Sequence, residues 1–313
     1  MRLTEISHAE VQRAINRTPI GSTCTELNTS FHSASDAPGL DIPSEAPYNY
    51  ARWLPLIARS QSVRESRVRR VRLTKSQNRL LISTAEGSIP TRELNRIYRE
   101  EIGEEITPVL TRQLSFSEPQ GYFLRLDACS PKDGNGGVEG LKGVQAIIMR
   151  LVTSLRALSA MRRLEESGQP LDLFFLPFDD SMQTQREYRV FCPPGCGRIS
   201  AISQYGPSRR WMMADETKDE RARIAERVVE EAERTFTDIK SSLDITSEFD
   251  ALIMKQGLSF DLCYDEVKNK GVLVELNAFG ARGPAGSCLF HWIKDREVLY
   301  DLAGDEIEFR VAV

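Results

Sequence analysis

Residues 258–277 read LSFDLCYDEVKNKGVLVELN, and this stretch carries the strongest structural signal in the sequence. Two runs within it, 258–264 and 272–276, are apolar except for isolated polar residues, and a charged turn that ends in glycine joins them. Runs of this length on either side of a turn are typical of β-strands. The stretch therefore predicts a hairpin near the end of the sequence.

The polar residues of this hairpin are two acids and an amide. Side chains alternate between the faces of a strand, so Glu275 and Asn277 share a face, and in a simple register Asp261 lies opposite them. A carboxylate in a core-like strand is costly unless it is paired or bound to a metal ion. Carboxylate and amide oxygens suit Mg²⁺ that also binds substrate phosphates, so we predict a magnesium site here. The alternative is that both acids lie on a solvated face.

The rest of the sequence predicts alternating layers of helix and strand. Period and turn signals indicate strands at 122–127, 171–178, 187–192 and 198–205, and helices at 91–106, 141–166 and 217–243. This order predicts an α+β fold with largely antiparallel sheets. Residues 1–49, which are polar after a short amphipathic helix, are expected to be a mobile arm or linker. Residues 50–313 are expected to form two lobes, about 50–170 and 171–313, that enclose a nucleotide.

Composition excludes several classes of function. The sequence has 313 residues, a net charge of −4 and three histidines, which leaves little scope for Ser-His, Cys-His or His-metal chemistry. Cys192 and Cys196 flank a Pro-Pro-Gly turn, but no second pair exists to complete a zinc site. No apolar run is long enough for a membrane helix, and residues 1–16 lack the apolar core of a signal peptide. We therefore expect a cytoplasmic protein.

Phosphates bound beside Mg²⁺ would need cations from elsewhere in the sequence. Arg125 is predicted on a strand, Lys132 in a polar loop, and Arg186 and Arg189 on or beside another strand. The glycines of the loop 130–137 would let backbone N–H groups approach a phosphate, although most such loops are plain turns. The apolar strand at 171–178 could contact an adenine, although such strands are more often core.

Residues 64–79 are rich in arginine, with one acid among seven basic residues. The simplest interpretation is a solvated basic face. The alternative is a docking surface for an acidic partner or for RNA, although no aromatic residues are interleaved to stack on bases.

Taken together, these motifs resemble the cell division cycle protein 123 family. The matching segments are Trp53-Leu-Pro with Gly87-Ser-Ile-Pro90, Phe123-Leu-Arg-Leu126 with Ser130-Pro-Lys-Asp133, Glu187-Tyr-Arg-Val-Phe191 with Ile202-Ser-Gln204, Phe260-Asp261 through Glu275-Leu-Asn-Ala-Phe-Gly280 with Leu289-Phe-His-Trp292, and Glu308-Phe-Arg-Val311. Their order and spacing are more specific than any one of them. The sequence departs from the family pattern at four positions: Arg125 for lysine, Tyr205 for arginine, Glu275 for aspartate and Ala278 for proline.

The resemblance implies an ATP-grasp fold that binds ATP and Mg²⁺. It implies that Asp261, Glu275 and Asn277 hold the ion. The nucleotide-binding residues predicted with it are Arg125, Lys132, Asp133, Gly136, Gly137, Phe175, Arg186, Glu187, Arg189 and Gln204. The implied partner is the γ subunit of the heterotrimeric translation initiation factor that delivers initiator tRNA, and the implied role is to promote assembly of that factor.

Two other functions remain open from the sequence. ATP-grasp folds commonly activate a carboxylate as an acyl phosphate and ligate it to an amine, using the same metal ion. A third function is an RNA-end-joining or RNA-binding protein that uses the arginine-rich segment 64–79. A ligase would consume ATP, whereas RNA binding would weaken steeply with salt.

Overall fold

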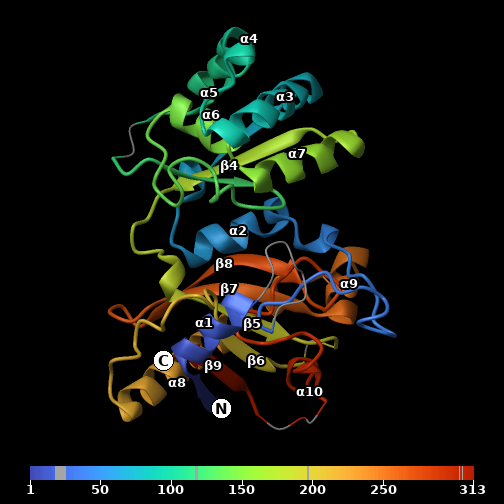
Figure 1. Ribbon diagram of the computed structural model, residues 1–313, viewed down its shortest axis with the longest axis vertical. Helices are drawn as coiled ribbons and strands as arrows, with labels where there is room; N and C mark the ends of the chain where they lie inside the picture. The colour runs from blue at the N-terminus through green and yellow to red at the C-terminus, as the bar shows by residue number, and fades with distance from the viewer. Residues whose placement is uncertain (18–25, 117–118, 196, 245, 303, 305) are drawn as a thin grey trace. The chain divides into compact units, whose positions relative to one another are not determined.

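The computed structural model describes residues 1–17, 26–116, 119–195, 197–244, 246–302, 304 and 306–313 (Figure 1). The chain divides into two compact units. One unit is the continuous segment Ser62–Asp180, and the other combines Met1–Gln61 with Ser181–Val313. The predicted lobes at 50–170 and 171–313 therefore need correction. Residues from both ends of the chain build one unit, which sequence-local patterns could not indicate.

The unit Ser62–Asp180 is built on a three-stranded antiparallel sheet in the order β2-β4-β3. The strands are β2 (Arg69–Leu73), β3 (Tyr122–Leu126) and β4 (Leu171–Pro177). The helices are η2 (Glu65–Arg67), α3 (Lys75–Thr91), η3 (Arg96–Tyr98), α4 (Arg99–Glu105), α5 (Thr107–Gln113), α6 (Val144–Val152) and α7 (Leu155–Glu166). Strands 122–127 and 171–178 were thus predicted to within one residue.

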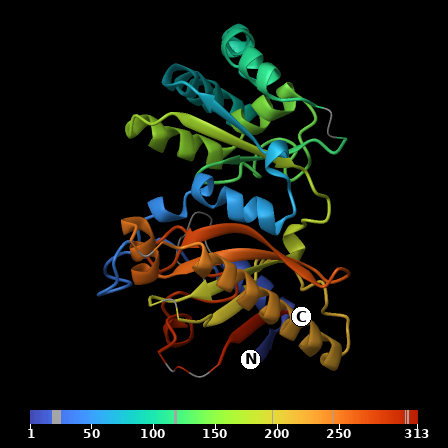
Figure 2. The ribbon, with the colours of Figure 1, turned by 180° about the vertical axis from the view of Figure 1, so that it is seen from behind.

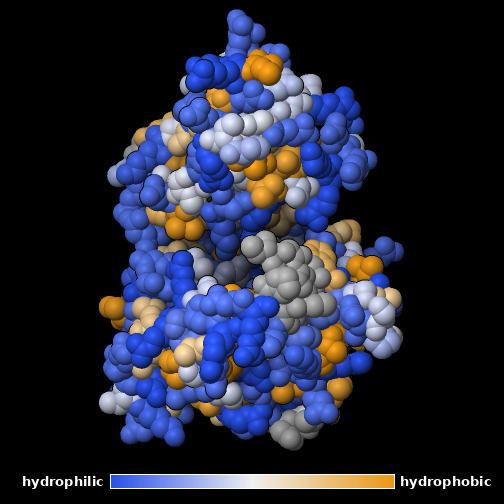
Figure 3. Space-filling view, viewed as in Figure 1, coloured by the Kyte–Doolittle hydropathy of each residue, from blue (hydrophilic) through white to orange (hydrophobic). Residues whose placement is uncertain are grey.

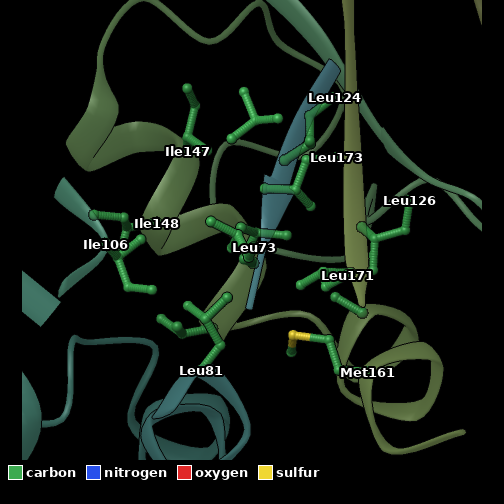
Figure 4. Close-up of a cluster of buried hydrophobic side chains, with 14 of the residues drawn as sticks. Leu73, Leu81, Ile106, Leu124, Leu126, Ile147, Ile148, Met161, Leu171 and Leu173 are labelled. Atoms are coloured by element: carbon green, nitrogen blue, oxygen red, sulfur yellow. The ribbon is translucent and has the colours of Figure 1, made fainter. Parts of the chain in front are cut away.

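A core fills one face of this sheet (Figure 4). Leu73, Leu124 and Leu173 come from the three strands and are almost entirely buried. Ile148 of α6 and Met161 of α7 pack against them. Because strand residues alternate, the opposite face of the sheet carries a different set of side chains, which is described with the site below.

Two helices predicted in this unit differ from those in the structure. The predicted helix 91–106 is replaced by the end of α3, η3 and α4, because α3 ends at Thr91 and the left-handed backbone of Arg92 (φ 59°) stops the helix. The predicted helix 141–166 is two helices. Thr153 and Ser154 separate them, and the Ser154 hydroxyl accepts a hydrogen bond from Ala157 N to cap α7.

The second unit contains a six-stranded sheet in the order β1-β9-β6-β5-β7-β8. Its strands are β1 (Arg2–Ile6), β5 (Glu187–Cys192), β6 (Ala201–Gln204), β7 (Leu258–Asp265), β8 (Lys270–Ala278) and β9 (Glu308–Ala312). Strands β6, β5, β7 and β8 pair antiparallel, whereas β1–β9 and β9–β6 pair parallel. The predicted α+β fold with largely antiparallel sheets is confirmed.

Helices cover this sheet and its edge. They are α1 (His8–Arg17), η1 (Ala46–Tyr48), α2 (Tyr50–Ser60), η4 (Thr184–Arg186), α8 (Lys218–Ser241), α9 (Glu248–Gln256) and α10 (Arg296–Leu299). The long helix α8 packs on β7 and β8 (Figure 2). At the edge strand β8, Leu273 N donates to the Ser60 hydroxyl and Leu273 O accepts from Gln61, each at 2.8 Å. Helix α2 and its end therefore satisfy backbone groups that an open edge would expose.

The described N-terminal residues are part of this unit and do not form the separate arm that we expected. Strand β1 pairs with β9, and Asn28, Phe31 and His32 donate backbone hydrogen bonds to carbonyl groups in the loop 281–290. The polar composition of residues 1–49 predicted a linker because it gives no sign of these backbone pairings. Residues 18–25 of the expected arm lie outside the described residues.

The described surface in Figure 3 is mostly hydrophilic, with small separate hydrophobic patches. Among the described helices, none is long and apolar enough by itself to cross a membrane. The pair α6 and α7 meets that test only when the two helices are combined across a bend of 79°, and their apolar residues belong to the core of the unit Ser62–Asp180.

Candidate metal and nucleotide site

The predicted hairpin is formed by β7 and β8, with Asp261 directly opposite Glu275 and Ser259 directly opposite Asn277. The register shifts between Asp261 and Leu262, which marks a β-bulge next to the two carboxylates. Bulges of this kind redirect side chains and are common beside functional sites. The structure thus brings Asp261, Glu275 and Asn277 together on one face of the sheet, as the sequence predicted.

The neighbouring strand β5 adds Arg189 to this face. Arg189 lies opposite Asp261, and its guanidinium donates two hydrogen bonds of 2.8 Å to the two oxygens of that carboxylate. A third bond of 2.9 Å goes to Gly286 O, and Arg189 Nη2 is 3.9 Å from the Glu275 carboxylate. The Tyr205 ring centroid lies 5.0 Å from the guanidinium carbon. Arg189 is therefore fixed from several sides at the centre of the site.

Burial and the neighbouring charges shift the pKa values of Asp261 and Arg189. It raises the pKa of the Asp261 carboxyl to about 7; the Arg189 guanidinium lowers that pKa, and the nearby Glu275 carboxyl raises it further. Burial also opposes the charge of Arg189, but the Asp261 carboxylate keeps its pKa well above the ordinary value. Two carboxylates beside one guanidinium carry a net charge of −1 when all three are ionised. A cation would offset that charge.

The donor set fits Mg²⁺ in chemistry, because its ligands are carboxylate and amide oxygens. Each carboxylate oxygen has two lone pairs, so the Asp261 oxygens can bind an ion while they accept from Arg189. Asn277 Nδ2 is buried and has no hydrogen-bond partner among the described residues. No group of three or more His, Cys, Asp or Glu side chains placed to hold an ion occurs among the described residues. The set therefore depends on the Asn277 amide and on oxygens from a substrate or water.

Three other predicted residues lie at the end of η4, on β5 and on β6. Arg186 forms an ion pair of 2.6 Å with Glu266. Glu187 is half-buried at the start of β5, on the same side of that strand as Arg189. Gln204 lies on the opposite side of the sheet, because its neighbour Ser203 is the residue opposite Arg189.

The role predicted for Gln204 is therefore not supported by its position. Its side-chain nitrogen donates to the carbonyls of Gly206 and Arg209, and its side-chain oxygen accepts from Ala312 N at 2.9 Å. These bonds use both ends of the amide to fix a loop and the end of β9, so Gln204 has a structural role.

The glycine-rich loop of the other unit is closed around Arg150, a buried residue that the sequence analysis overlooked. Arg150 donates to Asn135 O at 2.5 Å and to Glu139 O at 3.2 Å. Gly137 N donates to Gly134 O within the loop, which makes this amide unavailable to a phosphate. The glycines are required because the loop passes so close to Arg150: a Cβ on Gly134 would lie 2.2 Å from Arg150 O.

The other three predicted residues of this loop, Asp133, Gly136 and Lys132, have different surroundings. Asp133 accepts hydrogen bonds from the Ser154 hydroxyl at 2.5 Å and from Arg156 N at 3.2 Å. Its carboxylate therefore stabilises the N-terminal end of α7. Gly136 has φ 79° and its Cβ would lie 2.8 Å from Arg150 Nη2. Lys132 is half-buried in the loop. The cradle of N–H groups that the sequence predicted is mostly used for the loop's own structure.

Arg125 and Phe175 lie on opposite faces of the three-stranded sheet. Arg125 is opposite Phe174 in the β3–β4 register, so these two side chains share a face. Phe175 belongs to the helix-covered core and packs edge-on against Tyr122, with ring centroids 6.0 Å apart. Its side chain therefore lies on the core face of the sheet, not on the face of Arg125. Phe174 is fully buried on the Arg125 face, and the guanidinium carbon of Arg70 lies 5.6 Å from its ring centroid.

The fold can be compared with known structures. The sequence matches no protein-family model and no curated protein. In contrast, the structure of Cdc123 from Schizosaccharomyces pombe superposes with a TM-score of 0.56 over 88% of this chain and 100% of that chain, at 12% sequence identity. This chain has the fold of Cdc123. The C-terminally truncated Cdc123 from the same organism gives the same values. At this identity the likeness to Cdc123 concerns the fold alone.

Proposed function

We propose that this protein binds ATP with Mg²⁺ and acts, as the resemblance of its motifs to the cell division cycle protein 123 family implies, as an assembly chaperone for the heterotrimeric translation initiation factor. The observation that carries the proposal is the pair Asp261 and Glu275, opposite each other on β7 and β8 beside the buried Arg189. A buried pair of acids with one arginine is expensive to maintain for stability alone.

The proposed metal ligands are Asp261, Glu275 and Asn277. When bound, Mg²⁺ would neutralise phosphate charge. Arg189 would hold the Asp261 carboxylate in one orientation through its two hydrogen bonds. It would also lower the pKa of the Asp261 carboxyl against the effect of burial. We further propose that Arg125 contributes to nucleotide binding through its charge.

The proposed partner is the γ subunit of that initiation factor, which the motif resemblance implies. ATP would favour one conformation that is competent to bind it, because a ligand stabilises the state to which it binds more tightly. RNA binding through residues 64–79 is less well supported, because acids already offset several of the arginines. Arg70 and Arg72 both pair with Asp172, at 2.6 and 2.9 Å, and Arg79 pairs with Glu165 at 2.8 Å.

The experiment is to measure binding of the purified γ subunit with no nucleotide, with ATP and Mg²⁺, and with ADP and Mg²⁺, while ADP formation is assayed in the same samples. We expect tighter binding with ATP and Mg²⁺ and little ADP formation. Steady ADP formation with no effect on the γ subunit would favour an ATP-grasp ligase and contradict the chaperone role. Absence of γ-subunit binding under every condition would remove the proposed partner.

A further inference from the structure

Two buried polar atoms beside the proposed metal site lack hydrogen-bond partners among the described residues. They are the hydroxyl oxygen of Ser259 and the side-chain nitrogen of Asn277. Ser259 is completely buried, and it lies on β7 directly opposite Asn277 on β8. Each is two positions from a carboxylate, Asp261 or Glu275, on its own strand. The two unsatisfied atoms thus belong to the same face as the proposed ligands.

The surroundings of Ser259 give no structural reason for a hydroxyl. Across the sheet on β5 its neighbour is Phe191, which belongs to an apolar cluster with Phe290 and Trp292. A small apolar residue would suit this position, and it would avoid the cost of a buried hydroxyl without a partner. A serine at this position is explained if its hydroxyl forms a hydrogen bond when the ligand is bound.

We propose that Ser259 is a positioning residue for the metal ion, an inference that rests on the proposed function. Directly opposed residues of antiparallel strands have Cβ atoms about 4.5–5.5 Å apart, so a rotation of the Asn277 amide brings Nδ2 within reach of Ser259 Oγ. In that orientation Nδ2 donates to the hydroxyl and Oδ1 is held toward the ion. The hydrogen bond fixes which end of the amide faces the metal, as outer-shell partners commonly do.

The test uses the full chain as wild type, Ser259→Ala and Ser259→Thr. The first readout is the unfolding temperature without metal, and the second is the affinity for Mg²⁺ alone. We expect Ser259→Ala to unfold at the same or a higher temperature without metal, because it loses an unsatisfied hydroxyl. We expect its affinity for Mg²⁺ to fall about tenfold. Ser259→Thr keeps the hydroxyl and should restore most of that affinity.

A spectroscopic readout in the wild-type protein does not depend on any variant folding. Addition of Mg²⁺ should shift the side-chain NH₂ resonances of Asn277 and slow the exchange of the proton that is donated to Ser259. Unchanged exchange at this amide in the presence of bound Mg²⁺ would overturn the inference.

The outcomes separate this inference from the function on which it rests. If the wild type binds Mg²⁺ and Ser259→Ala binds it equally well, the role of Ser259 is wrong and the metal site stands. If the wild type does not respond to Mg²⁺ at all, both are wrong. Loss of stability in Ser259→Ala without metal would indicate a purely structural hydroxyl, and it would also contradict the inference.

Discussion

At the scale of single residues, the pair of Arg189 and Asp261 dominates the energetics of the site. Both side chains are nearly completely buried, and two hydrogen bonds of 2.8 Å join them. The sequence placed Arg189 near the ligand, but it could not place this residue opposite Asp261, because that requires β5 to lie beside β7. Strand order is a long-range property that local patterns do not determine. Ser259 was overlooked because nothing in a sequence marks a hydroxyl as unsatisfied.

Replacement of Arg189 tests this pair. Arg189→Met leaves a buried carboxylate without its cation, so the free energy of unfolding at pH 8 should fall by about 3–5 kcal/mol. At pH 5 the fall should be smaller, because Asp261, whose pKa burial raises to about 7, is then protonated in the native state. Denaturant unfolding at both pH values measures the change.

The control is Arg162→Met, which removes a pair of 2.7 Å between Arg162 and Glu86, both more than half exposed. Exposed pairs of this kind contribute about 0–1 kcal/mol. A loss for Arg189→Met no larger than that of the control, or equal losses at pH 5 and pH 8, would contradict the buried charge pair.

The raised pKa of Asp261 also predicts how metal affinity depends on pH. Mg²⁺ must displace the proton that the carboxyl holds below about pH 7, so affinity should rise with pH through that value. One displaced proton makes binding about tenfold weaker at pH 6 than at pH 8. Titration with Mg²⁺ alone avoids the protonation of ATP itself. Affinity that is constant over this range would mean that Asp261 is ionised throughout or is not a ligand.

The raised pKa of Asp261 also predicts how the stability of the metal-free protein changes with pH. Asp261 holds its proton more tightly in the native state than in the unfolded state, where its pKa is near 3.8. Its contribution to stability is therefore complete below about pH 4 and is lost as the pH rises through about 7. Bound Mg²⁺ should offset this loss above pH 7.

At the scale of elements, the glycine-rich loop illustrates the limit of motif analysis. Its composition indicates a loop, but the sequence does not reveal that Arg150 fills its centre and takes up two of its carbonyl groups. The face on which a strand residue lies is equally hard to predict: β4 was located to within one residue, yet Phe175, which was named as a nucleotide-site candidate, lies on the core face. Hairpin β7–β8, in contrast, was predictable because its polar residues mark one face.

We expect Arg150→Met to loosen the loop without unfolding the unit. The carbonyls of Asn135 and Glu139 would lose their donor, while the helix–sheet core keeps its apolar contacts. Hydrogen exchange should show faster exchange at Asn135 N, which donates to the Thr153 hydroxyl at 2.8 Å, and unchanged protection in β4.

The control is Arg156→Met, because the Arg156 side chain lies outside the loop's network and only its backbone N contacts Asp133. It should leave exchange at Asn135 unchanged. Equal effects of the two variants, or loss of protection throughout the unit, would contradict a local role for Arg150.

At the scale of the whole molecule, the α+β class and most strands of the second half of the chain were predictable, because their alternation and turns are local. The contribution of β1 to the large sheet was not, since five mostly polar residues at one end of the sequence pair with β9 near the other. The Cdc123 fold supports the motif resemblance, although identity is only 12%. The proposed function therefore depends on whether this site binds ATP and Mg²⁺.

The most direct measurement is calorimetric titration of ATP with Mg²⁺ into the wild type and into Asp261→Asn/Glu275→Gln, which keeps the size of both side chains and removes their charge. Arg162→Met, which removes only an exposed ion pair, serves as the control. We predict Mg²⁺-dependent ATP binding in the wild type and the control, and its loss in the double variant while the fold persists. Absence of ATP binding in the wild type, or equal Mg²⁺-dependent binding in the double variant, would contradict the proposed metal and nucleotide site.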